Sequence, residues 1–173
     1  MSLRRLENEV LRVLKHGQIT FGDANWNPIQ VSISQFYGIE INDFAVTVAK
    51  TALWIAESQM LKETEKIVLM HLDFLPLKSY TNIIEGNALR IDWEDVVPKN
   101  ELNYIMGNPP FVGYSLQSKS QKEDILSIYV DEKGKPYKTA GKIDYVSGWY
   151  WKAAQLMQGT AIRTAFVSTN SIT

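Results

Sequence analysis

The sequence predicts an α/β fold with a mostly parallel sheet and helices on both faces. Short apolar runs of strand type alternate along the chain with segments whose apolar residues recur every three to four positions. Such alternation is typical of parallel strands joined by helical crossovers. At 173 residues, the chain is long enough for one domain with a substantial core.

Two helices are predicted in the first third of the chain. The first is amphipathic and stops at Gly17; its apolar residues, three or four positions apart, are Leu3, Leu6, Val10, Val13 and Leu14. The second spans residues 43–60, and along one of its sides lie Phe44, Val48, Ala52, Ile55 and Gln59. The apolar run at 67–72 fits either a strand or the end of a helix.

Four apolar runs are predicted as strands, at residues 36–41, 83–89, 102–107 and 161–167. A further helix is expected over 144–157. Residues 113–141 read as a long loop with a short helix near 121–129. Tryptophans at helical spacing are expected to pack in the core rather than to stack on bases: Trp54, Trp149 and Trp151.

Composition excludes several function classes. There is no cysteine, so neither a disulfide framework nor a thiolate nucleophile for cytosine-C5 methylation is available. Without cysteine, His16 and His71 are too few for a zinc site, and no metal is predicted. No apolar run approaches the roughly 20 residues of a membrane span and no signal peptide is recognised, so we expect a cytoplasmic protein.

The segment Asn108-Pro109-Pro110-Phe111 follows the predicted strand at 102–107. In an open α/β sheet, the carboxyl end of a strand is where ligands bind. Prolines remove backbone donors, so the Asn108 side-chain oxygen and the Pro109 carbonyl form a pair of acceptors suited to an amino group on a planar ring. Phe111 could stack on that ring. Alone, the segment is also compatible with a simple turn.

Glu40 is the single charge near the end of the strand predicted at 36–41. A carboxylate at this position can accept hydrogen bonds from a ribose diol. A helix-terminus acid that complements the dipole of the next helix is an equally good interpretation from this residue alone.

Three segments in order resemble amino-group methyltransferases that use S-adenosylmethionine, above all adenine-N6 DNA methyltransferases of the large, single-chain restriction-modification type. Residues 35–41 resemble the second strand of that family, and 83–89 its third strand and turn. Asn108-Pro109-Pro110-Phe111 resembles its catalytic motif. The resemblance covers about residues 35–173 and implies a Rossmann-like class I methyltransferase fold.

The resemblance also implies the site. The catalytic residues would be Asn108, Pro109, Pro110 and Phe111, and S-adenosylmethionine would be bound by Glu40, Ile41, Asn87, Ala88 and Asn108. The family usually has Asp where this chain has Asn87; an Asn oxygen still accepts from an amine but lacks the charge assistance. A tight turn after Gly86 is an almost equally good interpretation of Asn87. DNA would be the partner, read mainly by a recognition domain outside these residues.

The family's glycine-rich turn after its first strand has no counterpart before residue 35. We therefore expect a fragment of one catalytic domain: 1–34 helix and loop after an absent first strand, 35–112 cofactor and catalytic motifs, 113–142 a long loop, 143–173 a helix and a strand. Without that strand two sheet edges would stay open. The fragment alone should bind S-adenosylmethionine poorly, be inactive, and possess edges through which it can self-associate.

Three alternatives stay open at this point. An enzyme with the same tetrapeptide could methylate a guanine amine in RNA or a glutamine amide in a protein. A non-catalytic methylase-like scaffold would fit Asn87 and the missing glycine turn. A nucleotide-dependent oxidoreductase would explain Glu40 but not the segment 108–111. The net charge of −1 does not favour nucleic acid, and the lysines of the 113–141 loop fit either a solvated surface or contacts with a DNA backbone.

Overall fold

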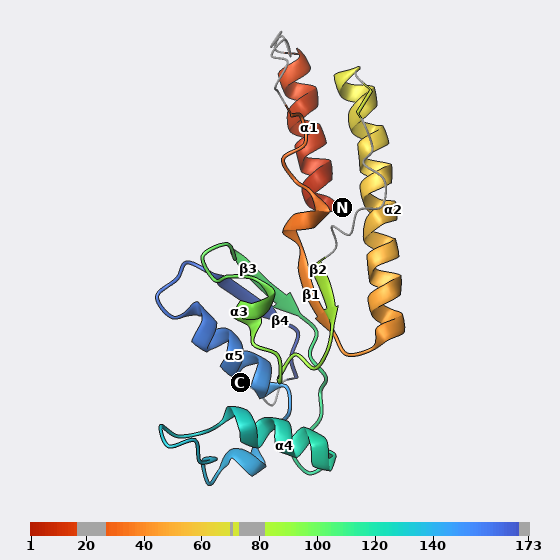
Figure 1. The fold of residues 1–173 in the computed structure, drawn as a ribbon. Coiled ribbons are helices and arrows are strands. Elements are labelled where there is room, and N and C mark those ends of the chain that lie inside the picture. Colours follow the sequence, from red (N-terminus) through yellow and green to blue (C-terminus); the bar gives the residue numbers. More distant parts are fainter. Residues whose placement is uncertain (17–26, 70, 73–81, 170–173) are drawn as a thin grey trace. The chain divides into compact units, whose positions relative to one another are not determined.

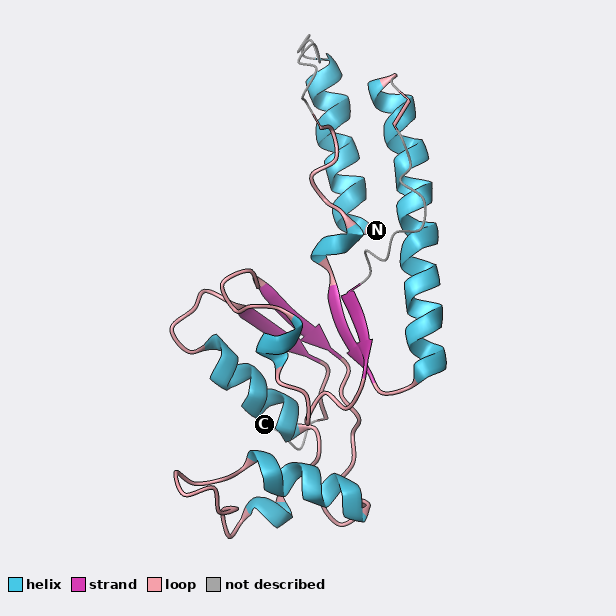
Figure 2. Cartoon of the chain, viewed as in Figure 1, coloured by secondary structure: helices cyan, strands magenta, loops and turns pink. Residues whose placement is uncertain are grey.

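The computed structural model of the chain describes residues 1–16, 27–69, 71–72 and 82–169. They form two compact units, Met1–Glu85 and Gly86–Thr173. Figure 1 labels the elements and Figure 2 separates helices from strands. The predicted α/β class is confirmed, since each unit combines helices with one pair of parallel strands. Gly17, the predicted stop of the first helix, lies outside the described residues.

The first unit contains two long helices that pack on each other, α1 (Ser2–His16) and α2 (Asp43–Val68) (Figure 1). The prediction for α2 was too short. Asn42 caps its start through a 2.9 Å hydrogen bond from the Ala45 N–H to Oδ1, and Leu69 ends it with a left-handed φ of 55°. The apolar run after residue 67 is thus the end of a helix.

The face that α1 uses for packing differs from the expected one. Its predicted apolar stripe is largely exposed, at Leu3, Leu6, Val10 and Val13, whereas Arg4, Asn8 and Leu11 are buried. The reason is a buried polar contact with α2: the Thr64 hydroxyl lies 2.7 Å from Asn8 Oδ1 and accepts from Arg4 Nη2 at 3.2 Å. Periodicity identified the helix correctly but not the side that meets α2.

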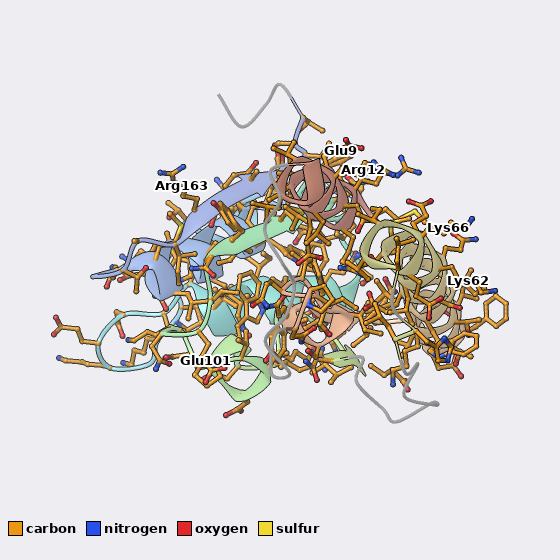
Figure 3. The ribbon with its side chains drawn as sticks, turned by 90° about the horizontal axis from the view of Figure 1, so that it is seen from above. Glu9, Arg12, Lys62, Lys66, Glu101 and Arg163 are labelled. Atoms are coloured by element: carbon orange, nitrogen blue, oxygen red, sulfur yellow. The ribbon has the colours of Figure 1, made fainter. Side chains whose placement is uncertain are left out.

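Several charged side chains, unlike that of Arg4, lie on the outside of this helix pair. Figure 3 labels Glu9 and Arg12 on α1 and Lys62 and Lys66 on α2, and all four point away from the packed faces. Most of the buried apolar side chains of α2 come from its last third, Met60, Leu61, Ile67 and Val68, and Val46 is buried near its start. The side of α2 that holds Phe44, Val48 and Ile55 is exposed.

The strands of the first unit are β1 (Tyr37–Glu40) and β2 (Asn82–Glu85). They pair in parallel, with Tyr37 opposite Asn82 and Glu40 opposite Glu85. The short helix η1 (Ile33–Gln35) leads into β1, and a capping box at Ser32 caps the start of this helix. Both strands are shorter than predicted, and residues 86–89 form a turn rather than the end of a strand.

The second unit holds β3 (Tyr104–Gly107) and β4 (Arg163–Phe166), which pair in parallel with Gly107 opposite Phe166. Its helices are α3 (Trp93–Val96), α4 (Lys119–Ile128), η2 (Ala140–Lys142) and α5 (Ser147–Met157). The helix predicted over 144–157 therefore starts later, and α4 lies close to the short helix predicted near 121–129.

Leu89, Ile125 and Tyr145 form the core of the second unit. Gly148 lets α5 approach it closely, because a Cβ at this position would lie 3.0 Å from both methyl groups of Leu89. Trp149 packs against the core and meets the Tyr145 ring edge-on at 5.3 Å. Its predicted packing role is confirmed, and Trp151 likewise packs on an aromatic ring, that of Tyr129 at 4.9 Å.

Candidate functional site

In the first unit, Glu40 ends β1 immediately before the start of α2. Its Oε1 accepts a 3.0 Å hydrogen bond from the Asn42 N–H, and Asn42 in turn caps α2. Glu40 is half-buried, and among the described residues its second oxygen has no hydrogen-bond partner. Ile41 beside it is 68% exposed. The end of β1 thus presents one free carboxylate oxygen next to an apolar side chain.

In the second unit, Gly86 and Asn87 start a tight turn. Gly86 has a φ of 157°, and a Cβ there would lie 2.3 Å from Ile91 Cδ1, so both the backbone conformation and the space favour glycine. The Asn87 carbonyl accepts from the N–H groups of Arg90 and Ile91 at 2.9 and 3.0 Å. Asn87 Oδ1 accepts from the Leu89 N–H at 2.9 Å. Asn87 therefore fills a tight turn and, at the same time, holds its carboxamide in a defined orientation.

The other end of the Asn87 carboxamide meets a buried acid that the sequence did not single out. Asn87 Nδ2 donates to Asp124 Oδ2 at 2.9 Å. Asp124, on α4, is 3% exposed and also accepts from the Tyr145 hydroxyl at 2.7 Å and from Arg90 Nε at 2.6 Å. Burial by itself raises the pKa of Asp124, but the hydrogen bonds from Tyr145, Arg90 and Asn87 hold that pKa below its usual value. Asp124 is therefore a carboxylate at neutral pH.

Lys152 holds the same turn from the side of α5. Its ammonium donates to the Leu89 carbonyl at 3.4 Å and to the Ile91 carbonyl, and it lies 5.6 Å from the centre of the Trp93 ring. Trp93 Nε1 donates to the Ala88 carbonyl at 2.8 Å. Burial lowers the pKa of Lys152, and the Asp92 carboxylate opposes that shift. These contacts leave the turn 87–91 with few ways to rearrange.

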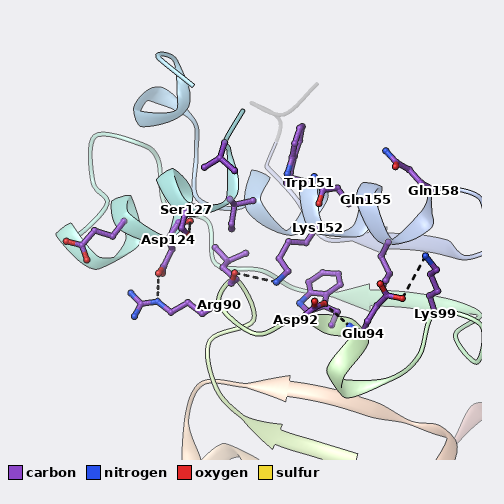
Figure 4. Close-up of a pocket in the computed structure, with 16 residues that line it drawn as sticks. Arg90, Asp92, Glu94, Lys99, Asp124, Ser127, Trp151, Lys152, Gln155 and Gln158 are labelled. Carbon is purple, nitrogen blue, oxygen red and sulfur yellow. Dashed lines mark hydrogen bonds and ion pairs between the residues drawn. The ribbon is translucent and has the colours of Figure 1, made fainter. Parts of the chain in front are cut away.

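A cavity of about 1030 Å³ borders this turn. Figure 4 draws the side chains that line it, among them Arg90, Asp124, Ser127, Trp151, Lys152 and Gln155. None of residues 108–111 lines it. Its charged walls are largely paired with each other: Arg90 with Asp124, and Lys99 with Glu94 at 3.9 Å. The cavity is thus separate from the predicted catalytic segment.

The predicted catalytic segment Asn108-Pro109-Pro110-Phe111 directly follows β3. Pro109 is buried, whereas Asn108 and Pro110 are exposed and Phe111 is 47% exposed. Among the described residues, the Asn108 carboxamide has no hydrogen-bond partner. The Asn108 carboxamide and the Phe111 ring that the sequence singled out are therefore accessible at the end of a parallel strand, whereas Pro109 is buried.

The loop after Phe111 is held by the segment that leads into α5. The Val112 carbonyl accepts from the Tyr145 N–H at 2.9 Å. Asp144 Oδ1 accepts from the Tyr114 N–H at 2.9 Å, and Gln117 Nε2 donates to the Ile143 carbonyl at 2.8 Å. The long loop predicted here is thus anchored at several points rather than freely solvated.

Tyr145 connects Asn87 to the loop that follows Phe111, both in the second unit. Its hydroxyl bonds to Asp124, which holds Asn87, and its backbone N–H holds Val112. Burial and the bond to Asp124 raise the pKa of Tyr145 to about 12, so the hydroxyl remains a donor at neutral pH. The structure therefore brings Asn87 and the loop after Phe111 into one network, whereas Glu40 and Ile41 belong to the first unit.

Sequence reasoning missed Asp124, Tyr145, Arg90 and Lys152. The only local signal for Asp124 was a carboxylate in a predicted helix, which is usually solvated. In the part of the chain that the structure describes, no group of three His, Asp or Glu side chains is placed to hold a metal ion. The same residues include no helix that is long and apolar enough to cross a membrane.

Comparison with known proteins gives three matches. A family model described as the DNA-methyltransferase domain of MmeI matches residues 1–173. The chain is 42% identical, over 174 residues, to DNA methyltransferase A of Bacillus subtilis (strain 168); the match covers 99% of this chain and 19% of that protein. A solved structure of the type IIL restriction-modification enzyme MmeI in complex with DNA matches with a TM-score of 0.83 and 43% identity, over 98% of this chain and 22% of that one. The chain thus spans about a fifth of the length of these relatives.

Proposed function

Since the chain belongs to the family of MmeI-type DNA-methyltransferase domains, with the partial Rossmann-like fold of that family, we propose that it is the catalytic segment of a longer restriction-modification enzyme that methylates the N6 amino group of adenine in DNA. The family implies a methyl donor of the S-adenosylmethionine type. The observation that carries the adenine assignment is the Asn108-Pro109-Pro110-Phe111 segment at the end of β3, with Asn108 and Phe111 exposed.

The segment suits an amino group because of what it offers and what it lacks. Asn108 Oδ1 and the Pro109 carbonyl can each accept one N–H of the target amine, and the two prolines place no competing donor beside them. Holding both N–H groups draws the nitrogen lone pair out of conjugation with the ring. S-adenosylmethionine would supply a sulfonium-bound methyl, whose C–S bond breaks with its electron pair left on sulfur as the nitrogen–carbon bond forms. One amino proton then leaves to solvent, and positioning supplies most of the rate.

Phe111 would hold the target base from the side. An adenine must leave the duplex stack to reach the segment, at a cost of about a few kcal/mol. The half-exposed Phe111 ring can offset part of that cost, since base–aromatic stacking is worth about 1–3 kcal/mol. Phe111 thus serves binding of the flipped base rather than the chemistry itself.

Within its own unit, each residue that we expect to bind the cofactor offers a group that suits this role. The second Glu40 oxygen is free to accept from a ribose hydroxyl, and the exposed Ile41 side chain offers an apolar surface to a ring. Asn87 Oδ1 has one lone pair left after its bond to Leu89, which suits the adenine amino group. Among the described residues, the Ala88 N–H has no acceptor, which suits a ring nitrogen.

The proposal is tested on the complete protein that carries this chain, because the relatives are about five times as long. Labelled methyl should pass from S-adenosylmethionine to duplex DNA, and mass spectrometry should identify N6-methyladenine. Asn108→Ala should abolish transfer, whereas Asn100→Ala, at an exposed asparagine in a turn, should leave it unchanged. Transfer to RNA or protein instead of DNA, or full activity of Asn108→Ala, would contradict the assignment. Self-association through strand edges and inactivity of the isolated chain remain predictions.

A further inference from the structure

The Asn87 carboxamide is a two-ended group, and this distinguishes it from a carboxylate. An Asp at this position offers only acceptors, whichever way it turns. An Asn offers an acceptor at Oδ1 and donors at Nδ2, so a half-turn about its last bond exchanges the two. For a site that must accept an N–H from adenine, only one of these orientations is productive.

The structure contains a partner for each end of the amide. The Leu89 N–H, a donor, meets Oδ1 at 2.9 Å, and the Asp124 carboxylate, an acceptor, meets Nδ2 at 2.9 Å. Turning the amide would set a donor against a donor and an oxygen against a carboxylate. Of the two partners Asp124 is the stronger, since hydrogen bonds to charged groups exceed those between neutral groups.

Asp124 is itself held in place. Its Oδ1 accepts from Arg90 and its Oδ2 accepts from Tyr145 in addition to Asn87. At 3% exposure its carboxylate is almost fully enclosed, and both of its oxygens already accept from these three donors. Its carboxylate can act only through the groups that it contacts, and Asn87 is the one of them that the proposed function assigns to the cofactor.

We propose that Asp124 is a positioning residue that fixes Asn87 with Oδ1 toward the cofactor, so that the site selects adenine by its 6-amino group. The inference rests on the proposed function, from which it takes the role of Asn87. It explains how a chain with Asn at this position can retain the acceptor that an Asp would provide. The negative charge that an Asp at position 87 would carry is instead on Asp124, whose carboxylate polarises and orients the Asn87 amide.

The test is ligand discrimination, measured by calorimetry on the complete protein with two probes. One is S-adenosylhomocysteine, and the other is its deaminated analogue, in which hypoxanthine replaces adenine and a 6-oxo group replaces the 6-amino group. The wild type should prefer the adenine probe by about tenfold or more, because the analogue sets an oxygen against Oδ1. Asp124→Ala removes the stronger of the two contacts that orient the Asn87 amide and leaves only the Leu89 N–H, so it should narrow that preference to about threefold or less.

Three further variants separate positioning from a general structural role. Tyr145→Phe removes a different bond to Asp124 and should keep the wild-type preference. Asn87→Asp combined with Asp124→Ala should restore the preference, since a carboxylate offers an acceptor in every orientation. Asp124→Leu combined with Tyr145→Phe replaces both buried partners with apolar groups and should narrow the preference as Asp124→Ala does, so the test does not depend on one variant folding.

The outcomes distinguish this inference from the proposed function. If the wild type prefers the adenine probe and the Asp124 variants weaken both probes by the same factor, Asp124 is merely structural and the inference is wrong, while the proposed function stands. Loss of preference in Tyr145→Phe to the same degree would also overturn it. If the wild type binds neither probe, or binds both equally, the cofactor role of Asn87 fails and the inference fails with it.

Discussion

Substitution of Gly86 by alanine should destabilise the chain more than any other single glycine-to-alanine change among those compared below. Gly86 has a φ of 157°, a region that side chains rarely adopt, and such strain costs on the order of 1–3 kcal/mol. The added Cβ would also lie 2.3 Å from Ile91 Cδ1, so the Ile91 side chain must leave its rotamer at about 0.5–1.5 kcal/mol. Together they predict a loss of about 1.5–4.5 kcal/mol in the free energy of unfolding.

Two other glycines provide matched controls for these two contributions. Gly159 has a φ of 71° but open space around its Cβ position, so Gly159→Ala should show the backbone strain alone. Gly141 also has open space and no positive φ, so Gly141→Ala should be neutral or slightly stabilising. Urea unfolding at 25 °C, followed by circular dichroism, gives the free energy of each variant.

The clash can be measured separately by a double-mutant cycle. Ile91→Val removes the Cδ1 atom that the new methyl group would strike and leaves Cγ1 at 3.4 Å, an acceptable contact. In the Gly86→Ala background it should recover about 1 kcal/mol relative to its effect in the wild type. A loss for Gly86→Ala within about 0.5 kcal/mol of that for Gly141→Ala would refute the geometry of this turn. If the effects of Gly86→Ala and Ile91→Val on the unfolding free energy were simply additive, the clash would be refuted but the backbone strain would not.

Three further predictions concern the buried polar contact in the first unit, the buried acid in the second and the exposed ring. Thr64→Val should cost about 2–4 kcal/mol because it leaves Asn8 and Arg4 without their buried partner, and Asn8→Leu in the same background should recover much of that loss in urea unfolding. The pKa of Asp124 is lower in the folded state than in the unfolded state, so the stabilisation by its carboxylate is present above the unfolded pKa and is lost as pH falls through the folded pKa. The difference in unfolding free energy between wild type and Asp124→Asn should therefore shrink at acid pH. A difference that stays constant with pH would contradict this prediction. Phe111→Ala should raise the transition-state free energy of methyl transfer by about 1–3 kcal/mol, measured as kcat/KM on duplex DNA, and a smaller loss on DNA with a mismatched, already unstacked target would support its stacking role.

Most of the correct predictions concern features that neighbouring residues define. Asn108-Pro109-Pro110-Phe111 was placed correctly after a parallel strand, because an apolar run followed by two prolines can only end a strand there. Glu40 was placed correctly at a strand end because a single charge closes an apolar run before a helix. These features depend on local backbone preferences, which a sequence displays directly.

The packing face of α1 shows where local pattern fails. Its apolar stripe, with Leu3 and Leu6, is the stronger periodic signal, yet the helix meets α2 through Arg4 and Asn8. The deciding contact joins Asn8 to Thr64, 56 positions further along the chain. A pattern of apolar residues cannot reveal a hydrogen bond between two polar side chains that are so far apart.

The sequence by itself determined the family, the α/β class and the identity of the side chains at the proposed methylation site. Only the tertiary structure decided how Asn87 is oriented, because that depends on Asp124 and Tyr145, which lie 37 and 58 positions away and form no motif with it. The physical reason is the range of each interaction. Strand ends, turns and helix caps depend on neighbouring residues, whereas the buried Asp124 carboxylate acquires its partners only when α4 and the segment before α5 pack against the turn.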